Sequence, residues 1–585
     1  MQLPILNTIP QTRQVTDVFA GYNHNLVIGD GEFYDMENLT SDFYPVLSPR
    51  AGRGKYVDAA CPLGMICKDG LCYVDGSELY INGSAVSGLA LDPSTEKTLV
   101  SMGAYIIIFP DKKYVNTVNT TDHGSLEAVY TSTGNVSVSL TKIDGSVYDS
   151  PSAISVGKVA PSSPSDGTYW IDSSQAVHTL KRYSSASGLW VAVATTYIKL
   201  VSTGMGANFA VGDGVTISGI AGNTSDGQLA AIDGNYTVWS RDADSIVIVG
   251  LVDSVKEISV PVTVKRAVPD MDFIIESGNR LWGCRHGISN GKTVNEIYAC
   301  KQGDFKNWNC FNGLSTDSYV ASLGSDGDFT GAVLYLGYPL FFKEHCIHKI
   351  YGSIPSNFGI QTTECRGVRK GCAKSLALVN ETLFYKSGSG ICAFDGSLPV
   401  DVSAAFGGVA YDNAVGCGHG NKYYVSMKDG SGNYSLFVYD TRKGIWHRED
   451  ALRVDAFCSC GDELYCIEHG KNAILTMLGS GDSDTAPVKW FAESGTMLID
   501  YPDRKYLSSI VLKMSLDTQS RVSVFVSYDS SGVWEHVFSY TSASLRSFNL
   551  PIRPHRCDHM RIRIEGSGNA KIFSLVKTIM QGSDR

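Results

Sequence analysis

Histidine and cysteine side chains come together at two places where they could bind a metal ion. His345, Cys346 and His348 lie within four residues of one another, and Cys557 and His559 are separated by one residue. Neighbouring residues of a strand point to opposite faces of the sheet, and neither group has a second pair at ligand spacing. We therefore expect no metal ion and no other cofactor.

Other residues that could act in catalysis lack the partners that catalysis needs. Cys372, or the pair Cys458 and Cys460, could supply a thiol nucleophile, but the sequence defines no histidine and acidic partner for it. The segment 527–534 is close to an S-x-D-x-G-x-x-W turn, but its Gly532 is displaced by one position and the motif occurs once. A hairpin turn explains this segment better. The sequence predicts that the chain is not an enzyme and has no catalytic residue.

The composition excludes several classes of protein. The 585 residues carry 49 Lys and Arg against 59 Asp and Glu, a net charge of −10, so no domain-wide basic field would hold a polyanion. The 60 glycines and 30 tyrosines are typical of many short strands joined by tight turns. No apolar run is long enough to span a membrane, and the N-terminus lacks a signal peptide. We therefore expect a chain that is kept in the cytoplasm or that leaves it by a route other than a cleaved signal.

The cysteines predict a reduced protein. All 15 are scattered between Cys61 and Cys557 without a C-x-x-C pair, and many have strand-like neighbours. Buried thiols that pack as small apolar residues account for this distribution better than a disulfide framework does.

A repeat predicts the main fold. A turn followed by an apolar-aromatic strand begins at residues 337, 380, 420 and 461, which are 43, 40 and 41 residues apart. Forty residues with about four strands is the length of a β-propeller blade, because one such sheet cannot bury both faces until other blades stack on it. We expect an all-β protein with a propeller of about five to seven blades.

Two regions depart from this repeat. Between about Leu126 and Val268, serine, threonine and glycine become dense and cysteine disappears, which predicts inserted small β domains. After Val488 the clean alternation of apolar and polar residues predicts a jelly-roll or β-sandwich. The predicted parts are an N-terminal arm (1–50), the first part of the propeller (51–125), the inserted domains (126–267), the second part of the propeller (268–487), and the C-terminal sandwich with a tail (488–585).

Two surfaces are candidates for binding. The densest basic stretch lies in the C-terminal domain, where a solvated strand face, or contact with an acidic neighbouring subunit, would use the same residues. The second surface is an aromatic platform in the insertion, which could stack on sugar rings if it lies on one exposed face. The basic residues are Arg546, Arg553, Arg556, Arg561 and Arg563, and the platform is Tyr169, Trp170 and Trp190.

The opening of the chain resembles a family of phage structural proteins found in prophages of Gram-positive bacteria. The resemblance lies in residues 19–50, which include Glu37-Asn38-Leu39-Thr40-Ser41-Asp42 and Tyr44-Pro45-Val46-Leu47-Ser48-Pro49-Arg50, and in segments 279–308 and 553–584. In the wider sense the chain is similar to the packaged-DNA stabilisation and tail-nozzle proteins of short-tailed phages. Those proteins are propellers with inserted β domains, and they form a ring below the portal and its adaptor.

The resemblance implies a virion component assembled in the host cytoplasm. We expect a nozzle subunit whose copies form a ring, hexameric or similar, that contacts the portal-adaptor, other tail proteins and, transiently, DNA. The runner-up is a receptor-binding or tail-tip protein that grips host surface glycan. A third option is a glycosidase on a propeller scaffold, which needs a central carboxylate pair that the sequence does not define. In the nozzle hypothesis the arm clamps a neighbouring subunit or the adaptor through Asp17, Asn25, Asp30, Tyr34 and Arg50.

Overall fold

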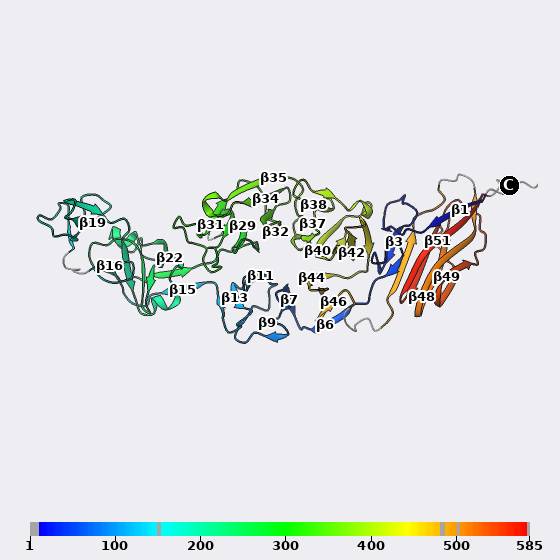
Figure 1. Ribbon diagram of the computed structural model, residues 1–585, viewed down its shortest axis with the longest axis horizontal. Coiled ribbons are helices and arrows are strands. Elements are labelled where there is room, and N and C mark those ends of the chain that lie inside the picture. Colours follow the sequence, from blue (N-terminus) through cyan, green and yellow to red (C-terminus); the bar gives the residue numbers. More distant parts are fainter. Residues whose placement is uncertain (1–10, 149–153, 290, 480–485, 500–503, 582–585) are drawn as a thin grey trace, which may run out of the picture.

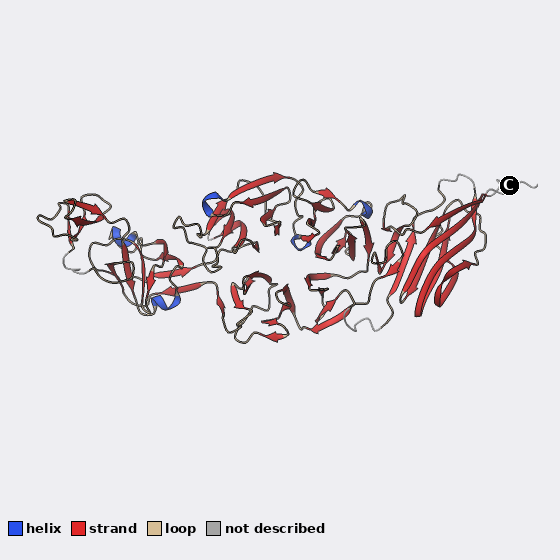
Figure 2. Ribbon diagram, in the orientation of Figure 1, coloured by secondary structure: helices blue, strands red, loops and turns tan. Residues whose placement is uncertain are grey.

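The computed structural model describes residues 11–148, 154–289, 291–479, 486–499 and 504–581. Strands dominate these residues (Figure 2), and their one α-helix, α1, spans Gly227–Ala230. The expected all-β architecture is confirmed. No helix in the described part of the chain is long and apolar enough to cross a membrane.

Seven four-stranded antiparallel sheets form a closed propeller (Figure 1). The first strand of each sheet lies innermost, and successive sheets contact one another around the ring until the seventh meets the first. The blades are β7 (Pro62–Cys67), β8 (Leu71–Asp75), β9 (Glu78–Ile81) and β10 (Ser84–Ala85); β11 (Thr98–Met102), β12 (Tyr105–Phe109), β13 (Lys113–Asn116) and β14 (His123–Ser125); β28 (Phe273–Glu276), β29 (Leu281–Ser289), β30 (Lys292–Ala299) and β31 (Tyr319–Ser322); β32 (Gly331–Tyr335), β33 (Tyr338–Phe342), β34 (Cys346–Tyr351) and β35 (Gly359–Glu364); β36 (Ala377–Val379), β37 (Thr382–Lys386), β38 (Ile391–Phe394) and β39 (Val400–Asp401); β40 (Tyr411–His419), β41 (Lys422–Asp429), β42 (Tyr434–Asp440) and β43 (Ile445–Arg448); and β44 (Val454–Cys460), β45 (Glu463–Glu468), β46 (Ala473–Thr476) and β6 (Gly54–Asp58).

The repeated apolar-aromatic segments become the second strands of the blades. In β33 the run Leu340–Phe342 is buried, and so is Leu383–Tyr385 in β37. Both faces of such a strand are covered because a neighbouring blade stacks on each side. The turn before β33 places Gly337 at φ 84°, a conformation that glycine adopts without steric cost.

Two connections fasten the seam where the ring closes. β6, which precedes the first blade in sequence, pairs with β46 as the outer strand of the seventh blade. Cys67 and Cys460, at the ends of the innermost strands of the first and seventh blades, form a disulfide. The prediction that every cysteine is a reduced thiol is therefore wrong for these two residues. The sequence offered no sign of the pairing, because its partners are 393 residues apart.

The insertion leaves the propeller between the second and third blades through a two-stranded stem, and it lies at one end of the molecule (Figure 1). β15 (Ala128–Thr131) and β27 (Thr263–Arg266) pair antiparallel, with Ala128 opposite Arg266. A four-stranded and a five-stranded sheet then enclose one apolar core. Those sheets contain β16 (Val136–Thr141), β21 (Tyr197–Val201), β22 (Gly214–Ser218), β23 (Gly234–Thr237), β24 (Ser240–Arg241), β25 (Ser245–Val249) and β26 (Lys256–Ile258).

A third sheet extends the insertion further from the propeller. It consists of β17 (Ser155–Gly157), β18 (Tyr169–Asp172), β19 (Thr179–Ser184) and β20 (Leu189–Ala192), placed in sequence between β16 and β21. One face has a small core of its own, made by Tyr148, Ile171 and Leu180. This sheet is the distal tip of the molecule (Figure 1).

An eight-stranded terminal sheet lies at the opposite end (Figure 1). β48 (Lys505–Tyr528) pairs with β51 (Ala570–Gln581) along its first half and with β50 (Met560–Ser567) along its second half. β49 (Glu535–Leu550) pairs with β48 along both halves, and β47 (Lys489–Ser494) pairs with β50. Hydrogen bonds thus join these strands into one sheet that changes partners along β48. Residues 578–581, expected in a tail, belong to β51.

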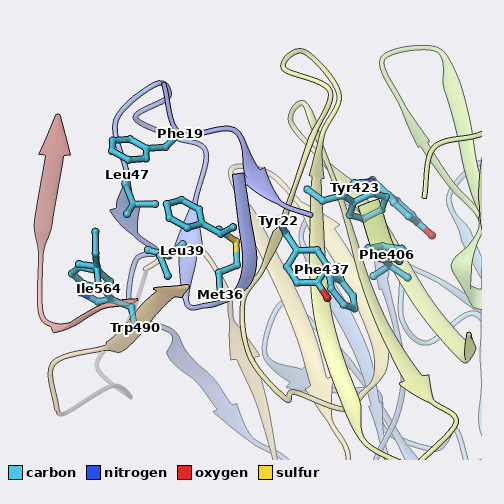
Figure 3. Close-up of a cluster of buried hydrophobic side chains, with 14 of the residues drawn as sticks. Phe19, Tyr22, Met36, Leu39, Leu47, Phe406, Tyr423, Phe437, Trp490 and Ile564 are labelled. Atoms are coloured by element: carbon cyan, nitrogen blue, oxygen red, sulfur yellow. The ribbon is translucent and has the colours of Figure 1, made fainter. Parts of the chain in front are cut away.

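The N-terminal segment belongs to this sheet and does not form a separate arm. β1 (Gln11–Thr16) pairs with β51, β3 (Glu32–Glu37) pairs with β47, and β2 (Gly21–Tyr22) pairs with β3. The short pair β4 (Leu39–Thr40) and β5 (Ser48–Pro49) follows. The physical reason is burial: Phe19, Met36, Leu39 and Leu47 lie in the core that joins the terminal sheet to the fifth and sixth blades (Figure 3).

Candidate functional site

A large concave site lies at one mouth of the propeller channel. Its volume is about 630 Å³, and its lining comes from the starts of innermost strands, where side chains of several blades converge. The lining residues are Glu96, Thr98, Asp272, Phe273, Ile274, Ala332, Gly371, Ala373, Lys374, Asn413, Val415, Tyr434, Arg453, Val454 and Asp455.

One side chain bridges this mouth. Lys374, on the short 3-10 helix η4 (Ala373–Ser375) before the fifth blade, forms an ion pair with Glu96 beside the second blade. Its ammonium group also donates a hydrogen bond of 2.6 Å to the carbonyl of Asp455 in the seventh blade. Lys374 therefore connects three blades across this mouth of the channel.

The other carboxylates of the mouth also have partners. Asp272 accepts from Arg285 at 2.6 Å and from the backbone N–H of His286 at 2.8 Å. Asp455 lies 2.9 Å from His469. Arg453 stacks its guanidinium over the ring of Tyr434 at 4.9 Å. This arrangement can bind a polar ligand through hydrogen bonds, and a ligand that reaches a carboxylate there must compete with its existing partner.

The residues expected to clamp a neighbouring subunit mostly contact their own chain. Asn25 donates to the carbonyl of Ala404 at 2.9 Å, and Asp30 pairs with the buried Lys577 at 2.5 Å. Tyr34 lies under the guanidinium of Arg561, while Arg50 is buried and lies 3.6 Å from Asp450. These four residues thus have partners in their own chain, and the clamp on a neighbouring subunit stays a prediction. Asp17 is exposed.

Two members of the predicted basic cluster are also used inside the chain. Arg561 and Arg563 point from β50 toward Glu493 on β47, at 2.7 and 3.6 Å. Burial raises the pKa of Glu493, and the two guanidinium groups oppose that rise. Arg563 also stacks on Phe491 at 4.2 Å. These two arginines connect β50 to β47, and the two alternatives for the basic cluster, a solvated strand face and a contact with an acidic subunit, stay predictions.

The remaining basic residues are exposed. Arg546 lies on β49 and covers the ring of Phe548 at 4.7 Å. Arg553 and Arg556 lie in the loop between β49 and β50. In the predicted cluster, Arg561 and Arg563 therefore pair with Glu493, and the other three arginines lie on the surface.

The aromatic platform is split between two faces of the distal sheet. The pairing of Trp170 with Lys181 and of Tyr183 with Trp190 puts these four residues on one face, while Tyr169 points to the other. Tyr169 packs on Tyr148 in the small core. Trp190 packs against Trp170 at 5.5 Å and against Tyr183 at 5.4 Å. The sequence therefore missed Tyr183 and wrongly included Tyr169, although alternation along each strand could have separated them.

The cysteines and histidines considered for chemistry have structural partners. His348 lies 3.5 Å from Cys346, and its ring nitrogens also contact Ser325 and Thr362 at 3.0 and 2.9 Å. Burial raises the pKa of the Cys458 thiol to about 12, which disfavours the nucleophilic thiolate. Within the described ranges, no group of three or more histidine, cysteine or acidic side chains could hold a metal ion.

Sequence reasoning missed the buried charges that connect the chain ends. Lys577 is 2% exposed and reaches Asp30 from the opposite end of the chain. Arg53 is also buried and pairs with Glu449 and Asp450. A single lysine within the apolar strand from Leu575 to Ile579 was the available signal for the first pair.

Comparisons with known proteins assign the chain to no family: no family model and no curated protein matches it. Among solved structures, it aligns with an exo-β-1,3-galactanase from Phanerochaete chrysosporium at 9% identity and a TM-score of 0.21, covering 52% of this chain and 94% of that one. A sialidase from Trypanosoma rangeli aligns at 8% identity and a TM-score of 0.22, covering 91% and 96%.

These comparisons correct the prediction that the chain is not an enzyme. The solved structures with which the chain aligns are glycoside hydrolases and a sialidase. A fold by itself neither assigns nor excludes catalysis. TM-scores near 0.2 carry no argument for a particular activity, and neither substrate nor reaction is transferred to this chain.

Proposed function

We propose that this chain is a structural protein of a bacteriophage tail, one subunit of the nozzle ring below the portal and adaptor, where it helps retain packaged DNA and forms the exit channel. The observation that carries the proposal is the order of parts along the molecule: a terminal sheet at one end, a propeller in the middle and an insertion at the other end (Figure 1). An elongated subunit of this kind can be held in a ring at one end and project along the tail at the other.

Two further observations favour a conduit formed between subunits. Lys374 crosses the mouth of the propeller channel, so DNA would pass through the lumen of the ring and not through the propeller axis. The net charge of −10 suits a lumen wall along which a polyanion slides, because a basic wall would hold it by counterion release. The sequence segments that resemble phage structural proteins add to this argument.

A second candidate is a receptor-binding or tail-tip protein. It is favoured by Tyr183 and Trp190, which are partly exposed next to the buried Trp170 on one face of the sheet farthest from the terminal sheet. Lys181 and Asp172 form an ion pair of 2.8 Å beside them and offer polar groups to a sugar. Aromatic side chains stacked on sugar rings supply much of the contact area in such recognition.

One experiment separates the two candidates. Particles that lack the protein should package DNA and then leak it if the chain is a nozzle subunit. Particles that carry Trp190→Ala with Tyr183→Ala should adsorb to cells normally in that case. Adsorption and retained DNA are measured on the same particles, with Val177→Ala, an exposed tip residue, as the matched control. Intact, DNA-filled particles that fail to adsorb would contradict the nozzle proposal and support the receptor binder.

A further inference from the structure

The terminal sheet has two edges that no strand of the same chain covers. β1 pairs only with β51, and β49 pairs only with β48. Within the described residues, the backbone hydrogen bond from Ile552 to the carbonyl of Leu550, at the end of β49, is the only one that reaches either strand from outside the sheet. Each edge therefore presents a row of backbone N–H and C=O groups that a further strand could pair with.

β49 is a long edge strand with few protective features. It has 16 residues, contains no proline, and carries Glu535 and Arg546 as its acidic and basic residues, although its register with β48 shifts at three places. Natural proteins protect edge strands with charges, prolines, bulges or short length, because an unprotected edge pairs with other chains. A strand of this length and composition is expected to have a partner in the assembled protein.

The strand directions indicate which partner fits. β1, β51, β48 and β49 are antiparallel in turn, so β49 runs opposite to β1. A second copy placed beside the first in the same orientation brings its β1 next to the first copy's β49. The two strands are then antiparallel, as a regular ladder of backbone hydrogen bonds requires.

We propose that β49 of one copy pairs with β1 of the next, so that the terminal sheets join head to tail around the ring. A contact between two different surfaces of the same protein generates a closed ring when the rotation between copies closes. The inference deepens the proposed nozzle function, on which it rests, by naming the neighbour and the strands that join.

The rows across the sheet identify residues that would meet. Val15 pairs with Val576, Val576 with Val511, and Val511 with Asn549, so the two edge residues Val15 and Asn549 lie in one row and on one face. Val15 is 54% exposed and Asn549 is exposed. Side-by-side copies therefore bring Val15 of one copy near Asn549 of its neighbour.

The short length of β1 limits the strength of the contact. Only six residues of β1 are available against 16 of β49. A single copy should therefore stay largely monomeric when dilute, and pairing should increase at high concentration or when the portal-adaptor gathers the subunits.

Cysteine cross-linking of the full-length protein tests the pairing and its direction. Val15→Cys and Asn549→Cys are made as separate variants in a Cys61→Ser background, which removes an exposed free thiol. The two variants are mixed at high concentration and oxidised, and covalent dimers are counted on a non-reducing gel. Leu545→Cys and Ser547→Cys extend the scan along the same face of β49, so that a slide of the two strands is also detected.

We expect covalent dimers in the mixture of Val15→Cys with Asn549→Cys. Their yield should be much higher than in either variant oxidised alone. A dimer in Asn549→Cys alone would show that two β49 strands pair with each other and would overturn the proposal. Absence of dimers with every β49 variant, while the variants keep the unfolding temperature of the parent, would also overturn it.

A charged residue introduced on the edge strand β49 gives a second measurement. Ser547→Lys should reduce cross-linking of Val15→Cys to Asn549→Cys severalfold, whereas Ser531→Lys, in the loop before β49, should leave it unchanged. Equal cross-linking in both lysine variants would contradict the proposal. These measurements use purified protein, so a failure of the nozzle function, seen as a position elsewhere in labelled particles, remains distinguishable from a failure of the pairing.

Discussion

Cys67 and Cys460 are bonded to each other across the seam of the propeller, at the ends of its first and last innermost strands. On the outer side of the same seventh blade, β6 is held by hydrogen bonds to β46. The junction of the first and seventh blades is thus held at two places. The disulfide joins the innermost strands, and β6, which precedes the first blade in sequence, pairs with β46 at the outer side.

Removal of the disulfide should destabilise the propeller. Cys67→Ser with Cys460→Ser is expected to lower the free energy of unfolding by about 2–4 kcal/mol, because the bond closes a long loop in the unfolded chain. Thermal unfolding of this double variant is compared with that of Cys61→Ser, which changes a free exposed thiol. An equal unfolding temperature in the two variants would show that β6 alone closes the ring.

Two buried histidines should make the protein less stable in mild acid. Burial lowers the pKa of His348 to about 4 and that of His447 to about 3, whereas both side chains titrate near 6.5 when unfolded. Below pH 6.5 the unfolded chain therefore binds protons that the folded chain does not, and stability falls as the pH falls from 6.5 toward 4. Each histidine contributes about 2 kcal/mol of loss at pH 5.

Unfolding measured between pH 7 and pH 5 tests this dependence. His348→Gln with His447→Gln should flatten the profile over that range, while His536→Gln, at an exposed position, should not. A parent profile that is already flat would contradict the prediction.

The N-terminal segment should behave as part of the core. Leu39→Ala is expected to cost about 2–5 kcal/mol of stability, because Leu39 is 1% exposed and its truncation leaves a cavity. Leu26→Ala, at an exposed position of the same segment, should change stability by less than about 0.5 kcal/mol. Similar small effects of both substitutions on thermal unfolding would indicate an arm that is not packed on the sheet.

Arg561 should stabilise the folded protein through its ion pair with Glu493. Arg561→Ala removes a partner of a nearly buried carboxylate and should cost about 1–3 kcal/mol at pH 7. Because the pKa of Glu493 is raised in the folded protein, this carboxyl protonates readily as the pH falls, and the cost should shrink below pH 4.5. Urea unfolding at pH 7 and below pH 4.5 measures this cost in stability, with Arg553→Ala, in an exposed loop, as the control.

The insertion should be removable at its stem. Replacement of residues 128–266 by a short Gly-Ser linker should leave a soluble protein with cooperative unfolding, because Ala128 and Arg266 are paired neighbours. Leu126 and Val268 stay in place, since both belong to the core of the second and third blades. Some loss of stability is expected because Asn307 loses its hydrogen bond to Asp213. Insoluble protein would show that the propeller depends on the insertion.

The sequence predicted the parts of the fold that depend on local repetition. The 40-residue spacing identified the blades, and the change of composition near Leu126 and Val268 marked the insertion within two residues of its stem. Contacts between distant segments left no local pattern. The pairing of β1 with β51 and the bond between Cys67 and Cys460 depend on chain ends and blades that meet only after the ring has formed.

The candidate sites were predicted less well for the same reason. A cluster of arginines in the sequence could not reveal that Arg561 and Arg563 form ion pairs with Glu493 on another strand. Likewise, Glu96 and Lys374 meet across the channel although 278 positions separate them in the sequence. Charge in the sequence indicates how many ionic groups exist, and only the fold decides which of them remain accessible.

The disulfide between Cys67 and Cys460 can form only late in the synthesis of the chain. A ribosome adds about 5–20 residues per second, so Cys460 emerges roughly 20–80 s after Cys67, and the first blade must wait that long for its covalent partner. β1 waits longer still, because β51 is made last among the described strands. A chain that ends before Ala570 would therefore lack the strand that pairs with β1. The N-terminal strand takes its place in the terminal sheet only when the chain is nearly complete.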